Sequence, residues 1–196
     1  MELIFATHNE HKAFEIRKEP DNNHKILTLN DIGYNIEIEE TGSTLEENSY
    51  IKAKHIYDIT GKSCFADDTG LEIEALNGEP GVYSARYAGE EGDSRKNIEK
   101  VLEKLKDKTN RKARFRTVIT LIMEGKTITF EGIVEGEIIR EPRGKDGFGY
   151  DPVFVPQGYN KTFAELTPEE KNKISHRGMA VRKLIRYLNQ YPKQDM

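Results

Sequence analysis

The pattern of apolar and polar positions predicts strands and helices that alternate from the first residues onward. Residues 2–6 form a short apolar run followed by polar residues, which predicts a buried strand, a loop and a helix over residues 10–18. Residues 35–40 (NIEIEE) alternate as a strand does, and so do residues 71–76 (LEIEAL). A strand, a loop and a helix in this order are typical of the start of an α/β protein.

Two further stretches have the pattern of helices. In residues 41–61, Ser43 and Glu46 have the spacing of a capping box, and Gly61 is expected to end the helix. Residues 93–107 are amphipathic, with apolar residues at i, i+3, i+4 and i+7. These apolar positions are Ile98, Val101, Leu102 and Leu105.

The second half of the chain begins with two β-branched runs, residues 113–125 and 126–139. Glu124 and Gly125 join them, which predicts a long antiparallel hairpin. A loop rich in glycine and proline then leads into a short strand.

The chain ends, over residues 167–191, with one short and one longer helix. Repeats and low-complexity linkers are absent from the sequence. We therefore predict one α/β domain over residues 1–196, with a single mixed sheet, flanking helices and a cleft between two lobes.

Composition narrows the functional classes. Charged residues make up 33% of the 196 residues and the net charge is only -4, so no global basic field indicates a nucleic-acid partner. A single cysteine, Cys64, excludes a disulfide framework and fits a reducing compartment. With no signal-peptide pattern and no apolar run of ~18–20 residues, we expect a cytoplasmic protein that does not enter a membrane.

Two stretches have residues suited to a phosphate and its metal ion. At the first strand–helix junction, free N–H groups and a lysine suit an anion, although the same residues fit an ordinary capped helix. The candidates there are Thr7, His8, Asn9, Glu10, His11 and Lys12. Asp67 and Asp68 are expected at one strand end, where a carboxylate, together with Glu39 or Glu40, suits a hard cation. Either acid pair also fits a solvated strand end or a capped turn.

Two later stretches suit a flat heterocycle. The glycine-rich GKDGFGYDP stretch contains two aromatic residues, which suit a ring that must be stacked, although a mobile surface loop is also possible. The candidates there are Phe148, Gly149, Tyr150 and Asp151. The EEKNKISHRG stretch adds hydrogen-bond donors, namely Lys171, His176 and Arg177, with Ser175 as a possible helix cap.

Six ordered pieces of the sequence together resemble the inosine triphosphate pyrophosphatase family, from Thr7 almost to the C-terminus. The pieces are T-x-N-x-x-K (Thr7, Asn9, Lys12), EETG-x-T with EN and K-A (residues 39–53), ADDTGL (66–71), G-x-PG-x-YSARYAG (78–89), GFGYDP-x-F (147–154) and ELT-x-EEKN-x-ISHRG (165–178). His8 stands where the family often has glycine, and Thr69 where serine is common. If position 8 requires a positive φ, His8 is strained there.

The resemblance implies hydrolysis of ITP, dITP and XTP to a monophosphate and pyrophosphate, with Mg²⁺ and in a homodimer. It implies that Glu39 and Asp68 hold the metal with Glu40 nearby, and that Asp68 activates water. Lys12 and Lys52 then offset phosphate charge, Thr69 lies beside the acids, and Phe148 stacks on the base. Donors from His176 and Arg177 favour a C6 keto oxygen over the adenine amine.

Two other functions remain open on the sequence alone. One is a pyrophosphatase of a related fold that acts on modified pyrimidine triphosphates. The other is a module that binds nucleotides or RNA without hydrolysis.

Overall fold

The computed structural model describes residues 1–90 and 92–191 and has the predicted α/β composition. The strands are β1 (Glu2–Phe5), β2 (Lys25–Leu27), β3 (Cys64–Ile73), β4 (Pro80–Gly81), β5 (Lys112–Met123), β6 (Lys126–Ile138) and β7 (Phe154–Pro156). The helices are α1 (Glu10–Arg17), α2 (Leu45–Thr60), α3 (Ser94–Lys104), α4 (Pro168–Ile174) and α5 (His176–Gln190). None of the helices in these ranges is long and apolar enough to span a membrane.

The strands form one mixed sheet, as the sequence predicts. Their order is β2-β1-β3-β5-β6-β7, and β4 pairs with β3. β1 runs parallel to both β2 and β3, whereas β3–β4 and β6–β7 are antiparallel. By its contacts the chain divides into two compact units: unit 1 is residues 1–68, 118–131 and 180–196, and unit 2 is residues 69–117 and 132–179.

The predicted hairpin is confirmed. β5 and β6 are neighbours in the sheet, and Glu124 and Gly125 connect them with φ values of 51° and 73°. Two successive positive φ values are those of a type I′ turn, whose twist matches that of the flanking strands.

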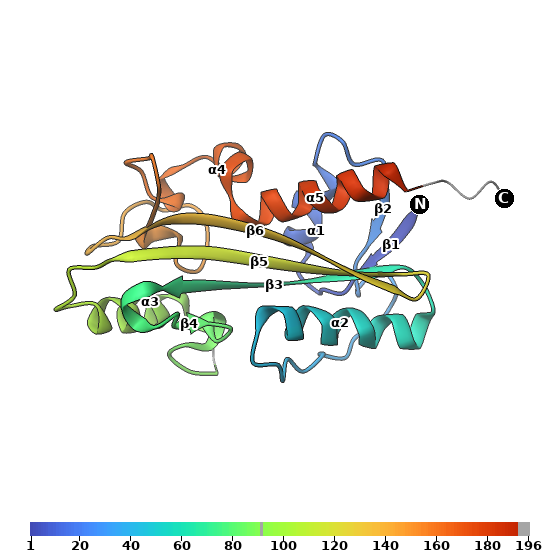
Figure 1. Ribbon diagram of the computed structural model, residues 1–196, viewed down its shortest axis with the longest axis horizontal. Coiled ribbons are helices and arrows are strands. Elements are labelled where there is room, and N and C mark those ends of the chain that lie inside the picture. Colours follow the sequence, from blue (N-terminus) through green and yellow to red (C-terminus); the bar gives the residue numbers. More distant parts are fainter. Residues whose placement is uncertain (91, 192–196) are drawn as a thin grey trace. The chain divides into compact units, whose positions relative to one another are not determined.

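Unit 1 has a core on each face of its strands, because successive side chains of β1 point to opposite faces. Leu3 and Phe5 pack with apolar residues of α1 and α5, and Ile4 and Ala6 pack with Ala53 and Ile56 of α2. Figure 1 shows α5 and α2 on opposite sides of the strands of this unit. The short apolar run at the start of the sequence is therefore buried on both faces.

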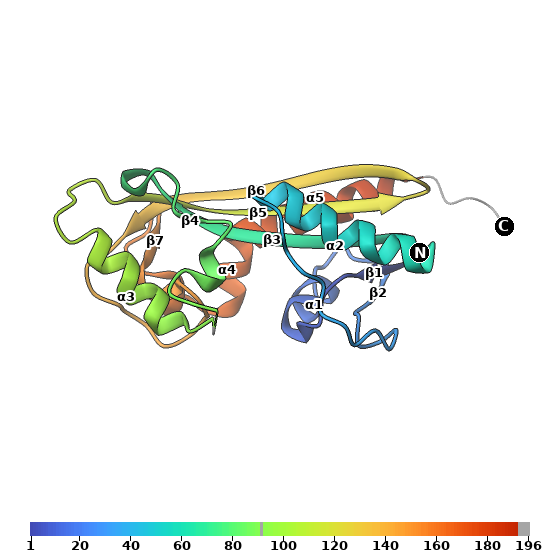
Figure 2. The ribbon, with the colours of Figure 1, turned by 90° about the horizontal axis from the view of Figure 1, so that it is seen from below.

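Unit 2 has its own core. Apolar residues of α3 and of the segment from β7 to α4 pack there with those of β3, β5 and β6. Figure 2 shows α3 and α4 on the same side of these strands. Phe115, Phe154 and Phe163 lie at the centre of this core, with ring centroids 4.6 to 5.9 Å apart.

Two local predictions are wrong. Residues 35–40 are irregular, although their alternating pattern predicts a strand; alternation does not make a strand where no neighbour pairs with it. The cap of α2 is Thr44 rather than Ser43, since the Thr44 side chain accepts a hydrogen bond from the Glu47 amide. The expected end of this helix is confirmed, because Gly61 follows it with φ 64°.

α2 offers a matched test of this packing. Ile56 is completely buried, whereas Ile59, one turn later, is 54% exposed. We expect Ile56→Ala to lower the free energy of unfolding by about 2–5 kcal/mol, because it leaves a cavity, and Ile59→Ala to change it by less than about 0.5 kcal/mol. Urea denaturation of both variants measures this difference, and equal effects would contradict the assigned helix face.

Candidate active site

The charged cluster of unit 1 lies on β3 and the two helices beside it. Lys12 of α1 donates to both carboxylate oxygens of Asp67, at 3.0 and 3.1 Å. Lys52 of α2 donates to the backbone carbonyl of Asp67 at 2.6 Å and to Glu40 at 3.2 Å. Four of the predicted site residues are thus brought together from separate parts of the sequence.

The position of Asp67 and Asp68 corrects the expectation of a strand end followed by a turn. Both acids lie inside β3, which continues through Thr69 and Gly70. The parallel partner β1 ends at Phe5, opposite Phe65, and the antiparallel pairing of β3 with β4 begins at Leu71, opposite Gly81. The two acids therefore lie in the part of β3 between these partners.

Of the two predicted acids at the end of the 35–40 segment, the structure brings Glu40 to the cluster. Glu40 contacts Lys52, and its charge also raises the pKa of Asp68. Glu39 is exposed and makes neither interaction among the described residues. The family resemblance implies the opposite order for this pair.

The pKa of Asp68 is raised to about 7. Burial is the main cause, the charges of Glu40 and Asp67 add to it, and Lys52 and a hydrogen bond from Asn48 oppose it. Burial also disfavours the charge of Lys52, but Asp67, Asp68 and Glu40 outweigh this effect and raise the pKa of Lys52. A group that titrates near neutral pH is suited to accept a proton from water.

Asn48 belongs to this site, and the sequence reasoning missed it as a functional residue. It is 1% exposed, it hydrogen-bonds to Asp68, and its Oδ1 accepts from the Gly42 amide at 2.7 Å. A Cβ on Gly42 would lie 2.6 Å from that Oδ1, so the glycine is required for this contact. The signal for Asn48 in the sequence was a polar amide on the buried face of α2, next to Ser49 and one turn before Lys52.

Several residues of the β1–α1 loop stabilise the local structure. Asn9 is the N-cap of α1 and accepts hydrogen bonds from the His11 and Lys12 amides. The Thr7 hydroxyl accepts from the Asn9 amide at 3.1 Å. The Glu10 carboxylate accepts hydrogen bonds from the Thr28 hydroxyl and from the side-chain amide of Asn30. The His11 side chain is exposed and lies beside Glu15.

His8 is not strained. Among the described residues, the non-glycine positions with positive φ are Asn77 and Glu124, so the concern about position 8 does not apply to this chain. The His8 ring contacts Asn30 and the Ile36 carbonyl, both within unit 1.

The carboxylates of this cluster are the candidate ligands for a divalent cation. Within the described residues, no three His, Cys, Asp or Glu side chains are grouped closely enough to hold a metal ion by themselves. Mg²⁺ is usually bound by one or two carboxylates together with substrate phosphates and waters. Glu40 and Asp68, two acids that repel each other, fit this smaller requirement.

A second cluster lies in unit 2, on the loop that precedes β7 and on α4. Asp151 is 3% exposed and accepts hydrogen bonds from the Phe148 amide at 3.0 Å and from Lys171 at 2.6 Å. Lys171 lies 4.5 Å, and the Arg177 guanidinium 5.5 Å, from the centre of the Phe148 ring, which is half exposed. Asp151 thus fixes both the lysine and the loop that presents the ring.

Two glycines give this loop its shape. Gly147 has φ +78°, and a Cβ there would lie 2.2 Å from the Asp151 carboxylate. Gly149 has φ +59° and open space around it. Both adopt a backbone conformation that other residues rarely adopt.

Of the remaining predicted residues of unit 2, Ser175, His176 and Arg177 are buried and Thr69 is half-buried. His176 stacks on Phe115 with ring centroids 4.7 Å apart, and Arg177 is 7% exposed. Ser175 accepts from the Gly178 amide, as expected of a cap for α5. The Thr69 hydroxyl lies 2.8 Å from that of Thr117.

Tyr150 is a core residue, contrary to its predicted place in the lining of a base pocket. It is 5% exposed, it packs in the core of unit 2, and its hydroxyl donates to the Ser84 carbonyl at 2.6 Å. Burial raises the pKa of Tyr150, so the phenol stays neutral.

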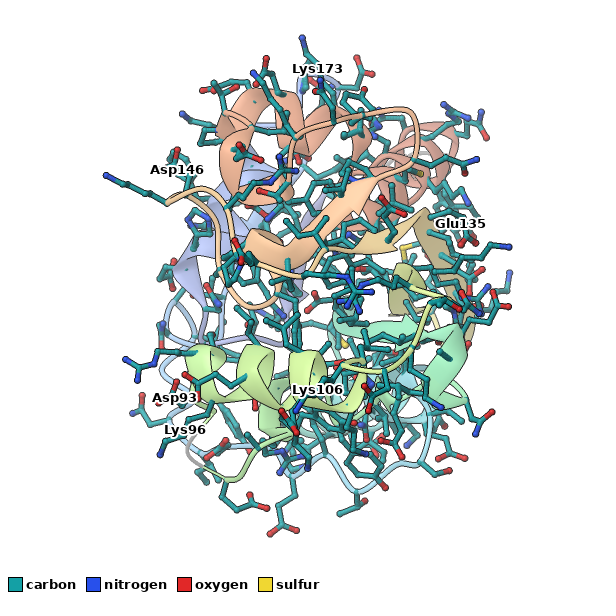
Figure 3. All side chains as sticks on the ribbon, turned by 90° about the vertical axis from the view of Figure 1, so that its left-hand side faces the viewer. Asp93, Lys96, Lys106, Glu135, Asp146 and Lys173 are labelled. Atoms are coloured by element: carbon teal, nitrogen blue, oxygen red, sulfur yellow. The ribbon has the colours of Figure 1, made fainter. Side chains whose placement is uncertain are left out.

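An open groove of about 790 Å³ in unit 2 contains none of the predicted site residues. It is lined by residues of β3, β5, β6 and β7 and their flanking loops, among them Glu72, Arg114 and Glu135. Figure 3 shows Glu135 and Asp146, a residue of the Phe148 loop, on opposite sides of the view. The groove is therefore distinct from the loop that carries Phe148.

The mixed α/β sheet, with a lysine–carboxylate cluster in unit 1 and a cation–aromatic cluster in unit 2, is that of an α/β protein whose side chains suit an anionic ligand with an aromatic ring. The chain belongs to the Ham1 family, whose model matches residues 3–187.

Curated relatives and solved structures agree with this assignment. The chain is 53% identical over 96% of its length to the whole of the dITP/XTP pyrophosphatase of Christiangramia forsetii. It is 51% identical to that of Bacillus subtilis, over 95% of this chain and 96% of the relative. A Ham1 protein from Coxiella burnetii has a TM-score of 0.90 and 43% identity, with 97% of this chain and 100% of that chain covered.

The raised pKa of Asp68 predicts a pH dependence of stability in metal-free protein. Between roughly pH 4 and pH 7 the folded state binds more protons than the unfolded state, so this contribution to the free energy of unfolding falls as pH rises. Asp68→Asn removes the contribution. In EDTA, we expect the free energy of unfolding of the variant to increase relative to that of the wild type as the pH rises from about 5 to about 8. Urea denaturation measures this, and a difference that does not vary with pH would contradict the shift.

Proposed function

We propose that this protein hydrolyses non-standard purine nucleoside triphosphates, namely dITP, XTP and ITP, to the monophosphate and pyrophosphate. Membership of the Ham1 family, with relatives named dITP/XTP pyrophosphatases at about half identity over nearly the whole chain, carries the proposal. The lysine–carboxylate cluster on β3 supports it, because it supplies both cations for phosphates and a carboxylate that titrates near neutral pH.

We assign Mg²⁺ as the metal and Glu40 and Asp68 as the acids that hold it, with Glu39 as the alternative to Glu40. When bound, the ion neutralises phosphate charge and makes a coordinated water more acidic. Two carboxylates that repel each other at neutral pH are stabilised by a cation placed near both.

The protein groups have separate tasks in this reaction. Asp68 orients the attacking water and accepts its proton. Lys12 and Lys52 offset the negative charge that grows on the phosphate oxygens and on the leaving pyrophosphate. Asp67 holds the Lys12 ammonium with both of its carboxylate oxygens and so fixes where this charge is placed.

Base selection is assigned to the cation–aromatic cluster of unit 2. Phe148 is half exposed, as a residue that stacks on a base must be. Lys171, His176 and Arg177 supply donors that suit the C6 keto oxygen of hypoxanthine and xanthine, and the adenine amine would leave such donors without an acceptor. Each buried donor left in this way costs about 1–3 kcal/mol.

We also propose that the protein acts in the cytoplasm as a homodimer and without nucleic acid. The net charge of -4 argues against a nucleic-acid partner. The loop of residues 78–89 and the β5–β6 hairpin are the surfaces proposed for the dimer contact.

Pyrophosphate release from dITP, XTP, ITP, dUTP and ATP, each with Mg²⁺ and with EDTA, tests the function. We expect release from the first three in Mg²⁺ and none in EDTA. Asp68→Asn keeps the shape of the side chain but not its charge, and should lower kcat at least about 100-fold. Preferred release from dUTP would indicate a pyrimidine enzyme, and none from any substrate a binding module. A variant that keeps more than about a tenth of kcat would refute the role of Asp68.

Arg177→Ala tests base reading. If Arg177 donates to the C6 oxygen, kcat/KM should fall far more for ITP than for ATP. The ratio of kcat/KM for ITP to kcat/KM for ATP should fall about tenfold or more, which corresponds to a loss of ~1.4 kcal/mol of discrimination between the two bases. Lys173→Ala is the matched control, because Lys173 is exposed on α4 and points outward in Figure 3. An unchanged ratio with equal losses for both nucleotides would make Arg177 a phosphate-binding residue instead.

A further inference from the structure

The segment that carries Glu40 has little backbone structure of its own. From Asn35 to Thr41 the described part of the chain makes no backbone–backbone hydrogen bond. The segment is also largely solvent-exposed, with Ile36 at 67%. Side chains from other elements must therefore determine its path.

Such contacts occur before, within and after the segment. Before it, the Tyr34 hydroxyl lies 2.6 Å from His55 of α2. After it, the Gly42 amide donates to Asn48. Between these two points, His8 Nε2 lies 3.3 Å from the Ile36 carbonyl oxygen, and Lys52 contacts Glu40. His8 is thus a polar contact from the β1–α1 loop to the middle of the segment, where Ile38 also packs against the core of unit 1.

The other side of the His8 ring is held as well. Nδ1 lies 3.0 Å from Oδ1 of Asn30. Asn30 cannot readily turn over, because its Nδ2 donates to the His8 carbonyl at 3.1 Å and to Glu10 at 2.9 Å. Both ring nitrogens therefore face oxygen acceptors of the protein, and the nitrogen that carries the ring proton donates to the acceptor that it faces.

We propose that His8 is a positioning residue that ties the β1–α1 loop to residues 36–40 and so places Glu40, rather than a ligand of the substrate phosphates. Its ring nitrogens face Asn30 and the Ile36 carbonyl. A glycine at this position has no side chain with which to form the tie. The effect of His8 on metal binding by Glu40 rests on the function proposed above. The contact between His8 and residues 36–40 does not depend on that function.

The tie can be tested without any enzymatic assay. Residues 37, 39 and 40 are glutamates, so a glutamate-specific protease cuts within the segment when it loosens. We expect His8→Ala to speed cleavage there about threefold or more relative to wild type, as the loss of hydrogen bonds to one side chain implies. His8→Gln, which retains one donor group, should give an intermediate rate.

His24→Gln is the matched control. His24 is also a histidine of unit 1, but it contacts the N-terminal amine and Asn189 instead of this segment. Its cleavage rate within residues 37–40 should equal that of the wild type. Thermal unfolding of each variant identifies any general loss of stability, and His8→Gln carries the test if His8→Ala does not fold.

The consequence for the reaction is measured by the Mg²⁺ concentration that gives half-maximal activity with ITP. His8→Ala should raise it about threefold or more, with kcat at saturating Mg²⁺ changed less than about twofold. Unchanged cleavage together with a raised KM for ITP would overturn the proposal and make His8 a phosphate ligand. Faster cleavage with an unchanged Mg²⁺ requirement would overturn the placing of Glu40. A wild type without activity would refute the proposed function, and the cleavage result would still decide the tie.

Discussion

The structure of unit 1 depends on the compensation of buried acids by two lysines. Asp67 is 4% exposed inside β3, and an ionised carboxylate in such a place is strongly unfavourable without a cation and hydrogen bonds. Lys12 and Lys52 supply both, from two helices that precede the strand in sequence. Asp68 is compensated less completely, and its pKa near 7 is the result. The features that allow this strand to carry two adjacent acids are thus also those that suit it to phosphate chemistry.

Both clusters contain the same kind of contact, in which a buried polar side chain fixes the path of an irregular loop by hydrogen bonds. In unit 1 the Asn48 amide accepts from Gly42 and reaches Asp68. In unit 2 the Asp151 carboxylate accepts from the Phe148 amide and from Lys171. Loops that bear functional groups lack the hydrogen-bond ladder of a sheet, so their precision depends on such contacts. Close approach to these side chains also explains the glycines at positions 42 and 147.

Sequence patterns were reliable where one physical effect dominated. The β5–β6 hairpin and α3 were predicted because long alternating or amphipathic runs are flanked by clear turn residues. Sequence patterns failed at residues 35–40, whose alternating segment has no neighbouring strand to pair with. Sequence patterns also failed at Asp67 and Asp68, which lie within a strand rather than at its end. They also misplaced Tyr150, because an aromatic residue in a glycine-rich loop can pack inward as well as face a ligand.

The sequence by itself determined the α/β class, the order of most elements and most of the candidate site residues, because these depend on local periodicity and on short motifs. Tertiary structure alone decided which of them meet. It brought Glu40 rather than Glu39 to Lys52 and Asp68, and it revealed Asn48 and the engagement of both nitrogens of His8. The physical reason is that contacts between residues distant in sequence, and the burial that shifts a pKa, arise only when separate strands and helices pack together.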